Sequence, residues 1–130
     1  MTKLKKVKKK KVKIWSTPNA DRKIAEFIKE RDNHTCVFCG RKSPYVIMDP
    51  SHYWGRYVSA TRFHPDNLDA VCRGCHFKIE HAKQGIYREF KLKQLGEQRY
   101  KELEKLYYQS KMTRSEAIKN LMEFLSTTEV

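Results

Sequence analysis

The sequence predicts an α+β fold in which two cysteine pairs close a loop that carries two short strands, with helices on either side. The cysteines form two identical units, Cys36/Cys39 and Cys72/Cys75, each with two residues between its members. The segment between the units is rich in turn, aromatic and β-branched residues. Before and after it, apolar residues recur at steps of three and four, which is typical of a helix with one buried face.

The first elements are an amphipathic helix and two strands. Thr17 and Pro18 resemble a helix start, with a hydroxyl cap and a proline at the first helical position. Apolar residues then recur at helical spacing, so we expect a helix over residues 18–31. Two short strands are expected around Val46–His52 and nearby.

Helices follow in the second half of the chain. Val71 to about Gln84 is expected to be a turn and then a helix, which Gly85 ends. Residues 86–94 and 97–109 have apolar positions at helical steps. The sequence from Thr113 to Glu116 is a capping box that opens a last helix. We therefore divide the chain into a basic tail (1–15), a core (16–85) and a helical C-terminal extension (86–130).

Composition limits the function. Among 130 residues, 28 are Lys or Arg and 15 are Asp or Glu, a formal net charge of +13, which indicates a polyanionic partner such as nucleic acid. The longest apolar run, Tyr45–Met48, is far shorter than the ~20 residues that a membrane span needs. No apolar stretch follows the basic N-terminus, so we expect no secretory signal and no membrane partner. A large-pocket metabolic enzyme is also disfavoured.

Residues 1–13 contain eight lysines and no acid. Such a block repels itself, so we expect it to be disordered in isolation and to add salt-dependent affinity for DNA. The alternatives are a solubility tail or a contact with an acidic membrane surface. The candidate nucleic-acid contacts in this tail are Lys8, Lys9, Lys10 and Lys11.

The two cysteine units together offer four thiolates, which is the ligand set of a closed tetrahedral zinc site. Gly40, next to Cys39, permits the positive φ of a knuckle turn. Two disulfides or a redox-active pair are the alternatives, but nothing indicates export and two converging units suit a metal better. We expect Cys36, Cys39, Cys72 and Cys75 to hold a structural zinc ion.

His52, Asn67 and His76 lie between and just after the cysteine pairs. In this order and within this frame they resemble the HNH nucleases of the ββα-metal class. The resemblance implies a zinc-stapled ββα-metal, treble-clef-like core. It also implies that His52 is the general base, that Asn67 orients it and that His76 binds a catalytic Mg²⁺ or Mn²⁺. A neutral histidine is a suitable base for phosphodiester hydrolysis near pH 7.

The second ligand of the catalytic ion is less directly indicated. In HNH nucleases the residue before the base is usually Asp or His, whereas this chain has Ser51. Asp49 is the nearest carboxylate upstream and is our first candidate. Glu80, one helical turn after His76, is the second.

A closer resemblance is to the phage lambda NinG family, also called Rap, of recombination nucleases. It rests on Ser51-His52-Tyr53-Trp54, Arg62-Phe63, Asn67, the second cysteine pair, Tyr87 and Leu95-Gly96. The resemblance implies cleavage of branched DNA such as Holliday junctions and D-loops. It also implies a phage or prophage source, the cytoplasm of a bacterial host, and a recombinase or single-strand-binding protein as partner. Symmetric cleavage of a four-way junction would require a homodimer.

Arg56 and Arg62 are our candidates for phosphate contacts, because they alternate with aromatic residues in the segment after His52. Three alternative functions stay open. They are a general HNH nicking, homing or restriction-type nuclease, a non-catalytic zinc protein that binds or anneals DNA, and an RNA-binding knuckle protein.

Overall fold

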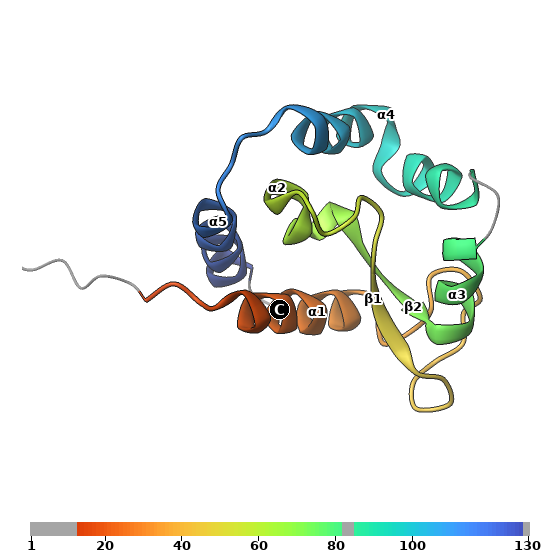
Figure 1. Ribbon diagram of the computed structural model, residues 1–130. Coiled ribbons are helices and arrows are strands. Elements are labelled where there is room, and N and C mark those ends of the chain that lie inside the picture. The colour runs from red at the N-terminus through yellow and green to blue at the C-terminus, as the bar shows by residue number, and fades with distance from the viewer. Residues whose placement is uncertain (1–12, 82–84, 129–130) are drawn as a thin grey trace, which may run out of the picture.

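The computed structural model describes residues 13–81 and 85–128. Figure 1 shows a two-stranded sheet with helices around it, which confirms a mixed α+β fold. The elements are α1 (Thr17–Arg31), β1 (Met48–His52), α2 (Ser59–Arg62), the 3-10 helix η1 (Pro65–Asn67), β2 (Leu68–Cys72), α3 (Arg73–His81), α4 (Ile86–Gln109) and α5 (Arg114–Thr127).

The sheet is an antiparallel pair of β1 and β2, in which Met48 pairs with Cys72 and His52 with Leu68. The second predicted strand is thus β2. Its last residues, Val71 and Cys72, were expected in a turn and instead continue the strand. All five β2 residues are buried, since both α1 and α3 contact the hairpin.

The core joins the two ends of the chain. Ala20, Ile24 and Ile28 of α1 pack into one buried cluster with the hairpin and with Ile118 and Leu121 of α5. The C-terminal helix therefore belongs to the same hydrophobic core as α1. The predicted division at residues 15 and 85 stays a prediction.

Two predicted helix starts can be compared with the structure. The capping box of α5 is confirmed, because Thr113 Oγ1 accepts from the Glu116 backbone N–H and Glu116 accepts from that of Thr113. The start of α1 was wrong by one residue, since its cap is Ser16, which accepts a hydrogen bond from the Asn19 N–H at 3.3 Å.

The helix α4 bends where the sequence predicted a break between two helical segments. Gly96 has φ 76° and ψ 165° inside the helix. This conformation is essentially restricted to glycine. The bend changes the direction of α4, which contacts α2 and η1 and continues toward α5 (Figure 1).

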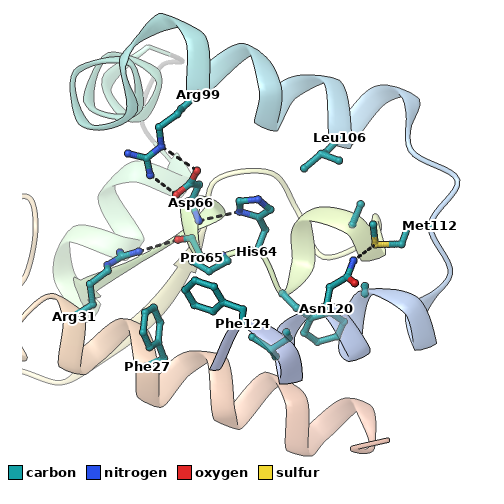
Figure 2. Close-up of a pocket in the computed structure, with 14 residues that line it drawn as sticks. Phe27, Arg31, His64, Pro65, Asp66, Arg99, Leu106, Met112, Asn120 and Phe124 are labelled. Atoms are coloured by element: carbon teal, nitrogen blue, oxygen red, sulfur yellow. Dashed lines mark hydrogen bonds and ion pairs between the residues drawn. The ribbon is translucent and has the colours of Figure 1, made fainter. Parts of the chain in front are cut away.

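A cavity of about 700 Å³ lies between α1, the α2–η1 segment, α4 and α5. Figure 2 shows its wall, with Phe27 and Phe124 on one side and the Arg99–Asp66 ion pair on the other. None of the predicted site residues lines it. In the described part of the chain, no helix is both long and apolar enough to cross a membrane.

Candidate functional site

The four cysteines meet at one end of the hairpin. Cys36 and Cys39 lie in the turn after α1, Cys72 ends β2, and Cys75 is in the first turn of α3. Their four sulfur atoms all lie within 4.8 Å of one another. The two units that are far apart in the sequence are therefore brought to one point, as predicted.

The turn that carries the first pair is a knuckle. Its geometry requires glycine at position 40, where φ is 76°. Cys36 donates its backbone N–H to Arg41 O at 2.9 Å, and Gly40 donates to Cys36 O at 2.9 Å. A further bond from Val37 N–H to Ala70 O at 3.0 Å ties the knuckle to β2.

The sulfur positions fit a tetrahedral zinc ion. Zn–S bonds of about 2.3 Å place the corners of a tetrahedron about 3.8 Å apart. Cys39 Sγ and Cys72 Sγ are 3.7 Å apart. Burial alone raises the pKa of Cys36, but hydrogen bonds from the backbone of Cys72, Cys39 and Phe38 outweigh it and lower the pKa to about 7. This favours the thiolate at Cys36, whereas burial and the neighbouring thiols raise the pKa of Cys75, so a metal would have to displace its proton on binding. The cluster thus suggests a zinc site.

His52 is the last residue of β1 and is partly buried. Its Nε2 lies 3.1 Å from Arg62 O. Because a carbonyl oxygen only accepts, Nε2 carries the proton and Nδ1 keeps its lone pair. Burial, followed by the positive charge of Arg56, lowers the pKa of His52 to about 4. The ring is therefore neutral at pH 7, with Nδ1 able to accept a proton.

Asn67 is fully buried at the end of η1, immediately before β2. Its Oδ1 accepts from the Trp54 backbone N–H at 2.8 Å. Its Nδ2 donates to Trp54 O and to Thr61 O, both at 2.9 Å. The structure gives no hydrogen bond between Asn67 and His52 among the described residues. Asn67 instead holds the segment from Trp54 to Thr61. The next residue, Arg62, provides the carbonyl oxygen that contacts His52.

The three candidate ligands of a catalytic ion lie together on the other side of the hairpin. His76 Nδ1 is 3.3 Å from Asp49 Oδ2, and His76 Nε2 is 3.2 Å from Glu80 Oε1. Burial raises the pKa of Asp49, but hydrogen bonds from Arg73 and His76 outweigh it and lower the pKa below its usual value. The two carboxylates therefore contact opposite edges of the imidazole ring.

His52 and Asp49 are three residues apart in β1, so alternation places them on opposite faces of the strand. The structure accordingly puts His52 close enough to Asp21 of α1 for its charge to act on the ring, whereas Asp49 contacts α3. His52 and His76 make no contact with each other in the described hydrogen-bond network. The predicted triad is thus divided into two neighbouring groups.

The predicted phosphate contacts differ in their surroundings. Arg62 makes two hydrogen bonds to the Asp21 carboxylate, at 3.1 and 2.6 Å, and these raise its pKa. Arg56 is exposed at the tip of the loop after β1. The tail residues Lys8, Lys9, Lys10 and Lys11 lie outside the described residues.

A buried ionic network lies beneath the hairpin and was not predicted. Lys91 and Asp69 are both fully buried and form an ion pair at 2.7 Å. Tyr87 donates to Asp69 at 2.8 Å and to Ser51 O at 3.2 Å. Two features of the sequence could have indicated this network. Asp69 is a charged residue inside an apolar strand, and Lys91 is on the same helical face as Tyr87 and Leu95.

An aromatic cleft of about 800 Å³ opens beside this region. Trp54 lies in its wall and stacks on Tyr107 at 4.5 Å with an interplanar angle of 14°. Tyr53 hydrogen-bonds Tyr100 at 2.8 Å. Since Glu80 also lines the cleft, the cleft adjoins the candidate ligands of the catalytic ion.

The comparisons with known proteins give one positive result. The family model described as "Bacteriophage Lambda NinG protein" matches residues 1–129. No curated protein and no solved structure matches the chain significantly.

Proposed function

Because the chain belongs to the bacteriophage Lambda NinG protein family, we propose that it is a metal-dependent DNA endonuclease acting on branched recombination intermediates. We further propose that its core is a zinc-stapled ββα-metal fold of the HNH type. The observation that carries the proposal is the order β1–β2–α3 with a four-cysteine cluster at its base. His52 ends the first strand, Asn67 precedes the second, and His76 is on the helix.

His52 would act as the general base. Its Nε2–H is held by Arg62 O, so Nδ1 would take a proton from the attacking water. A pKa of about 4 makes the ring a weak base in the protein alone. The negative charge of a bound phosphate would raise that pKa and make His52 a stronger base at neutral pH. Asn67 would serve as a positioning residue through the loop that supplies the Arg62 carbonyl.

Asp49, His76 and Glu80 fit a divalent cation only in part. They offer oxygen and nitrogen donors to Mg²⁺ or Mn²⁺, which would stabilise the charge on the phosphorane and the leaving oxygen. Asp49 and Glu80 contact opposite ring nitrogens, so one ion can be shared by His76 and only one of them in this arrangement. We assign Asp49 as the partner, because it is less exposed than Glu80. Because His52 and Asp49 lie on opposite faces of β1, contact of both with one scissile phosphate would require a rearrangement when DNA binds.

Arg56 would contact the substrate phosphates, because its exposed guanidinium is near His52. For Arg62 we propose a structural role instead of a phosphate contact, since its guanidinium is bound to Asp21 and fixes α2 to α1. The lysine tail would add affinity without selectivity. With a four-way junction as substrate, we propose that the protein acts as a homodimer. We also propose a recombinase or a single-strand-binding protein as its partner.

A second candidate function is a non-catalytic zinc protein that binds DNA. The observation that favours it is that, among the described residues, only the four cysteines bring three or more potential ligand atoms within 4.8 Å of one another. Ser51, which stands where HNH nucleases usually have a ligand, is buried beside Asp69. In this case the hairpin and α3 would be a binding scaffold.

Cleavage of a labelled four-way junction and of a linear duplex with the same sequence tests these functions. Both substrates are incubated with and without Mg²⁺ or Mn²⁺, for the parent and for His76→Ala. We expect metal-dependent cleavage that prefers the junction and is lost in the variant. Equal cleavage of both substrates would indicate a general HNH nuclease. Binding without cleavage in either metal would contradict the enzyme and favour the second candidate.

A further inference from the structure

The loop between β1 and α2 carries an unusually exposed aromatic side chain. Gly55, Arg56 and Tyr57 are all exposed, and Tyr57 is 98% exposed. A tyrosine ring gains nothing for folding in such a position, because it buries no apolar area. The tip projects next to the end of β1, where His52 is the last strand residue.

The two ends of this loop are fixed by the protein interior. Asn67 binds both backbone polar groups of Trp54 and the carbonyl of Thr61. The Trp54 ring is stacked on Tyr107. On the other side the loop runs into α2, where Arg62 N–H donates to Val58 O at 3.0 Å and the Arg62 side chain is fixed to Asp21 of α1. Because both ends of the loop are fixed, its exposed tip is pre-organised. Inserting the tip into a ligand would therefore cost little conformational entropy.

The loop has the charge that a DNA ligand requires. The loop and α2 together, from Tyr53 to Arg62, contain two arginines and no acid. Asp21 neutralises Arg62, whereas Arg56 has no ion-pair partner in the structure's described portion. Its charge acts on the His52 ring, which places the tip close to the proposed base.

From these observations, and resting on the proposed function, we propose that Tyr57 is a specificity-determining wedge that stacks on an unpaired or unstacked base at a DNA branch point. In a continuous duplex the wedge would first have to separate stacked base pairs, which costs a few kcal/mol. At a branch point the stack is already interrupted, so the aromatic contact is gained without that cost. Tyr57 would thus favour branched over linear DNA and bring the branch to His52.

The test compares Tyr57→Ala with Tyr57→Phe, and uses Tyr45→Ala as a matched control. Tyr45 is 90% exposed and lies before β1, a strand that spans roughly 13 Å, whereas Tyr57 lies after it. Figure 1 shows the two loops at opposite ends of β1. Because both tyrosines are exposed, neither alanine variant should alter folding.

Dissociation constants for a four-way junction and a matched duplex are measured by fluorescence anisotropy without added Mg²⁺ or Mn²⁺. A junction with 2-aminopurine beside the branch reports stacking directly. We expect Tyr57→Ala to weaken junction binding about tenfold and to remove the 2-aminopurine change, with duplex binding unchanged. Tyr57→Phe and Tyr45→Ala should behave like the parent.

Two results would overturn the wedge. One is a junction affinity of Tyr57→Ala within about twofold of the parent, and the other is an equal loss on junction and duplex. The outcome is separable from the nuclease proposal because binding is measured without cleavage. A parent that prefers junctions through Tyr57 but cuts nothing would retain the wedge and refute the nuclease. If the parent cuts both substrates alike and Tyr57→Ala binds them like the parent, the nuclease proposal would be retained and the wedge refuted.

Discussion

At the scale of single residues, the Asn67 side chain fixes the backbone of the segment after β1. Its amide is fully buried and makes three hydrogen bonds to the backbone of Trp54 and Thr61. We expect Asn67→Ala to lower the free energy of unfolding by about 3 kcal/mol, since it removes three hydrogen bonds and leaves the two backbone polar groups of Trp54 without this partner. Urea denaturation measures this loss.

Asn120→Ala is the control for that experiment, because Asn120 is exposed on α5. It should change stability by at most about 0.5 kcal/mol. Equal effects of the two substitutions would contradict the role assigned to Asn67.

The buried imidazole of His52 predicts a pH dependence of stability. Its pKa is about 4 in the folded protein. In the unfolded chain it should be about 6.5. The fold therefore favours the neutral ring. This contribution is complete above pH 6.5 and is lost as the pH falls toward 4, and its upper limit is about 3 kcal/mol. His52→Gln should lack this part of the acid destabilisation.

The measurement is the difference in unfolding free energy between parent and His52→Gln, followed from pH 7 to pH 4. Loss of zinc at acidic pH affects both proteins and cancels in the difference. A difference that stays constant over this range would show that His52 titrates normally.

The sequence predicted that the four cysteines lie together, but it did not predict the contacts of the other candidate residues. The four cysteines could be placed together because their spacing needs only a knuckle and a helix turn. The bonds of Asn67 could not be predicted, because they depend on how the loop from Tyr53 to Arg62 folds back onto η1. The pairing of Arg62 with Asp21 likewise depends on long-range packing.

At the scale of elements, the bend in α4 depends on one glycine. A Cβ atom at Gly96 would meet nothing within 4 Å, but its φ of 76° strains any other residue. We expect Gly96→Ala to lower stability by about 1–3 kcal/mol. Gly74→Ala is the matched control, since it also has open space and lies in α3 with an ordinary φ. It should be neutral or slightly stabilising.

Melting temperatures of the two variants, measured with zinc bound, test this prediction. If Gly96→Ala melts no lower than Gly74→Ala, the bend does not need glycine.

Helices were predicted more reliably than strands. The helical segments have a regular apolar spacing and local start signals, such as the capping box of α5. By contrast, β2 is buried along its whole length, so its sequence, Leu68–Cys72, lacks the alternation that marks a half-exposed strand. Its charged member, Asp69, is buried because Lys91 of α4 neutralises it.

At the scale of the whole molecule, the zinc site should determine whether the protein folds. The cysteines link the turn after α1 to the junction of β2 and α3, and so connect the first helix to the hairpin. We expect one zinc ion per chain and a large fall in melting temperature when a chelator removes it. Adding Zn²⁺ should restore the fold, whereas Mg²⁺ should not. An unchanged melting temperature in the metal-free protein would contradict a structural role.

The whole molecule also brings together residues that the sequence keeps apart. α4 supplies Lys91 and Tyr87 to the buried network under the hairpin, and Tyr107 to the base of the loop after β1. Residues of the C-terminal helices thus support the candidate site although none belongs to the predicted triad. Sequence spacing could not show this, because these contacts are set by how α4 packs against the rest of the fold.

The most direct test of the central claim, that His52 is the base of a nuclease, is a single-turnover cleavage rate. Parent, His52→Gln and His34→Asn are compared on a labelled four-way junction with Mg²⁺. Glutamine can keep the bond to Arg62 O but cannot accept the proton, and asparagine tolerates the positive φ of exposed His34.

We expect His52→Gln to cut at least about a hundredfold more slowly than the parent, while it binds the junction and zinc equally well. His34→Asn should cut at the parental rate. A His52→Gln protein that binds and cuts the junction like the parent would contradict the assignment of His52 as the base.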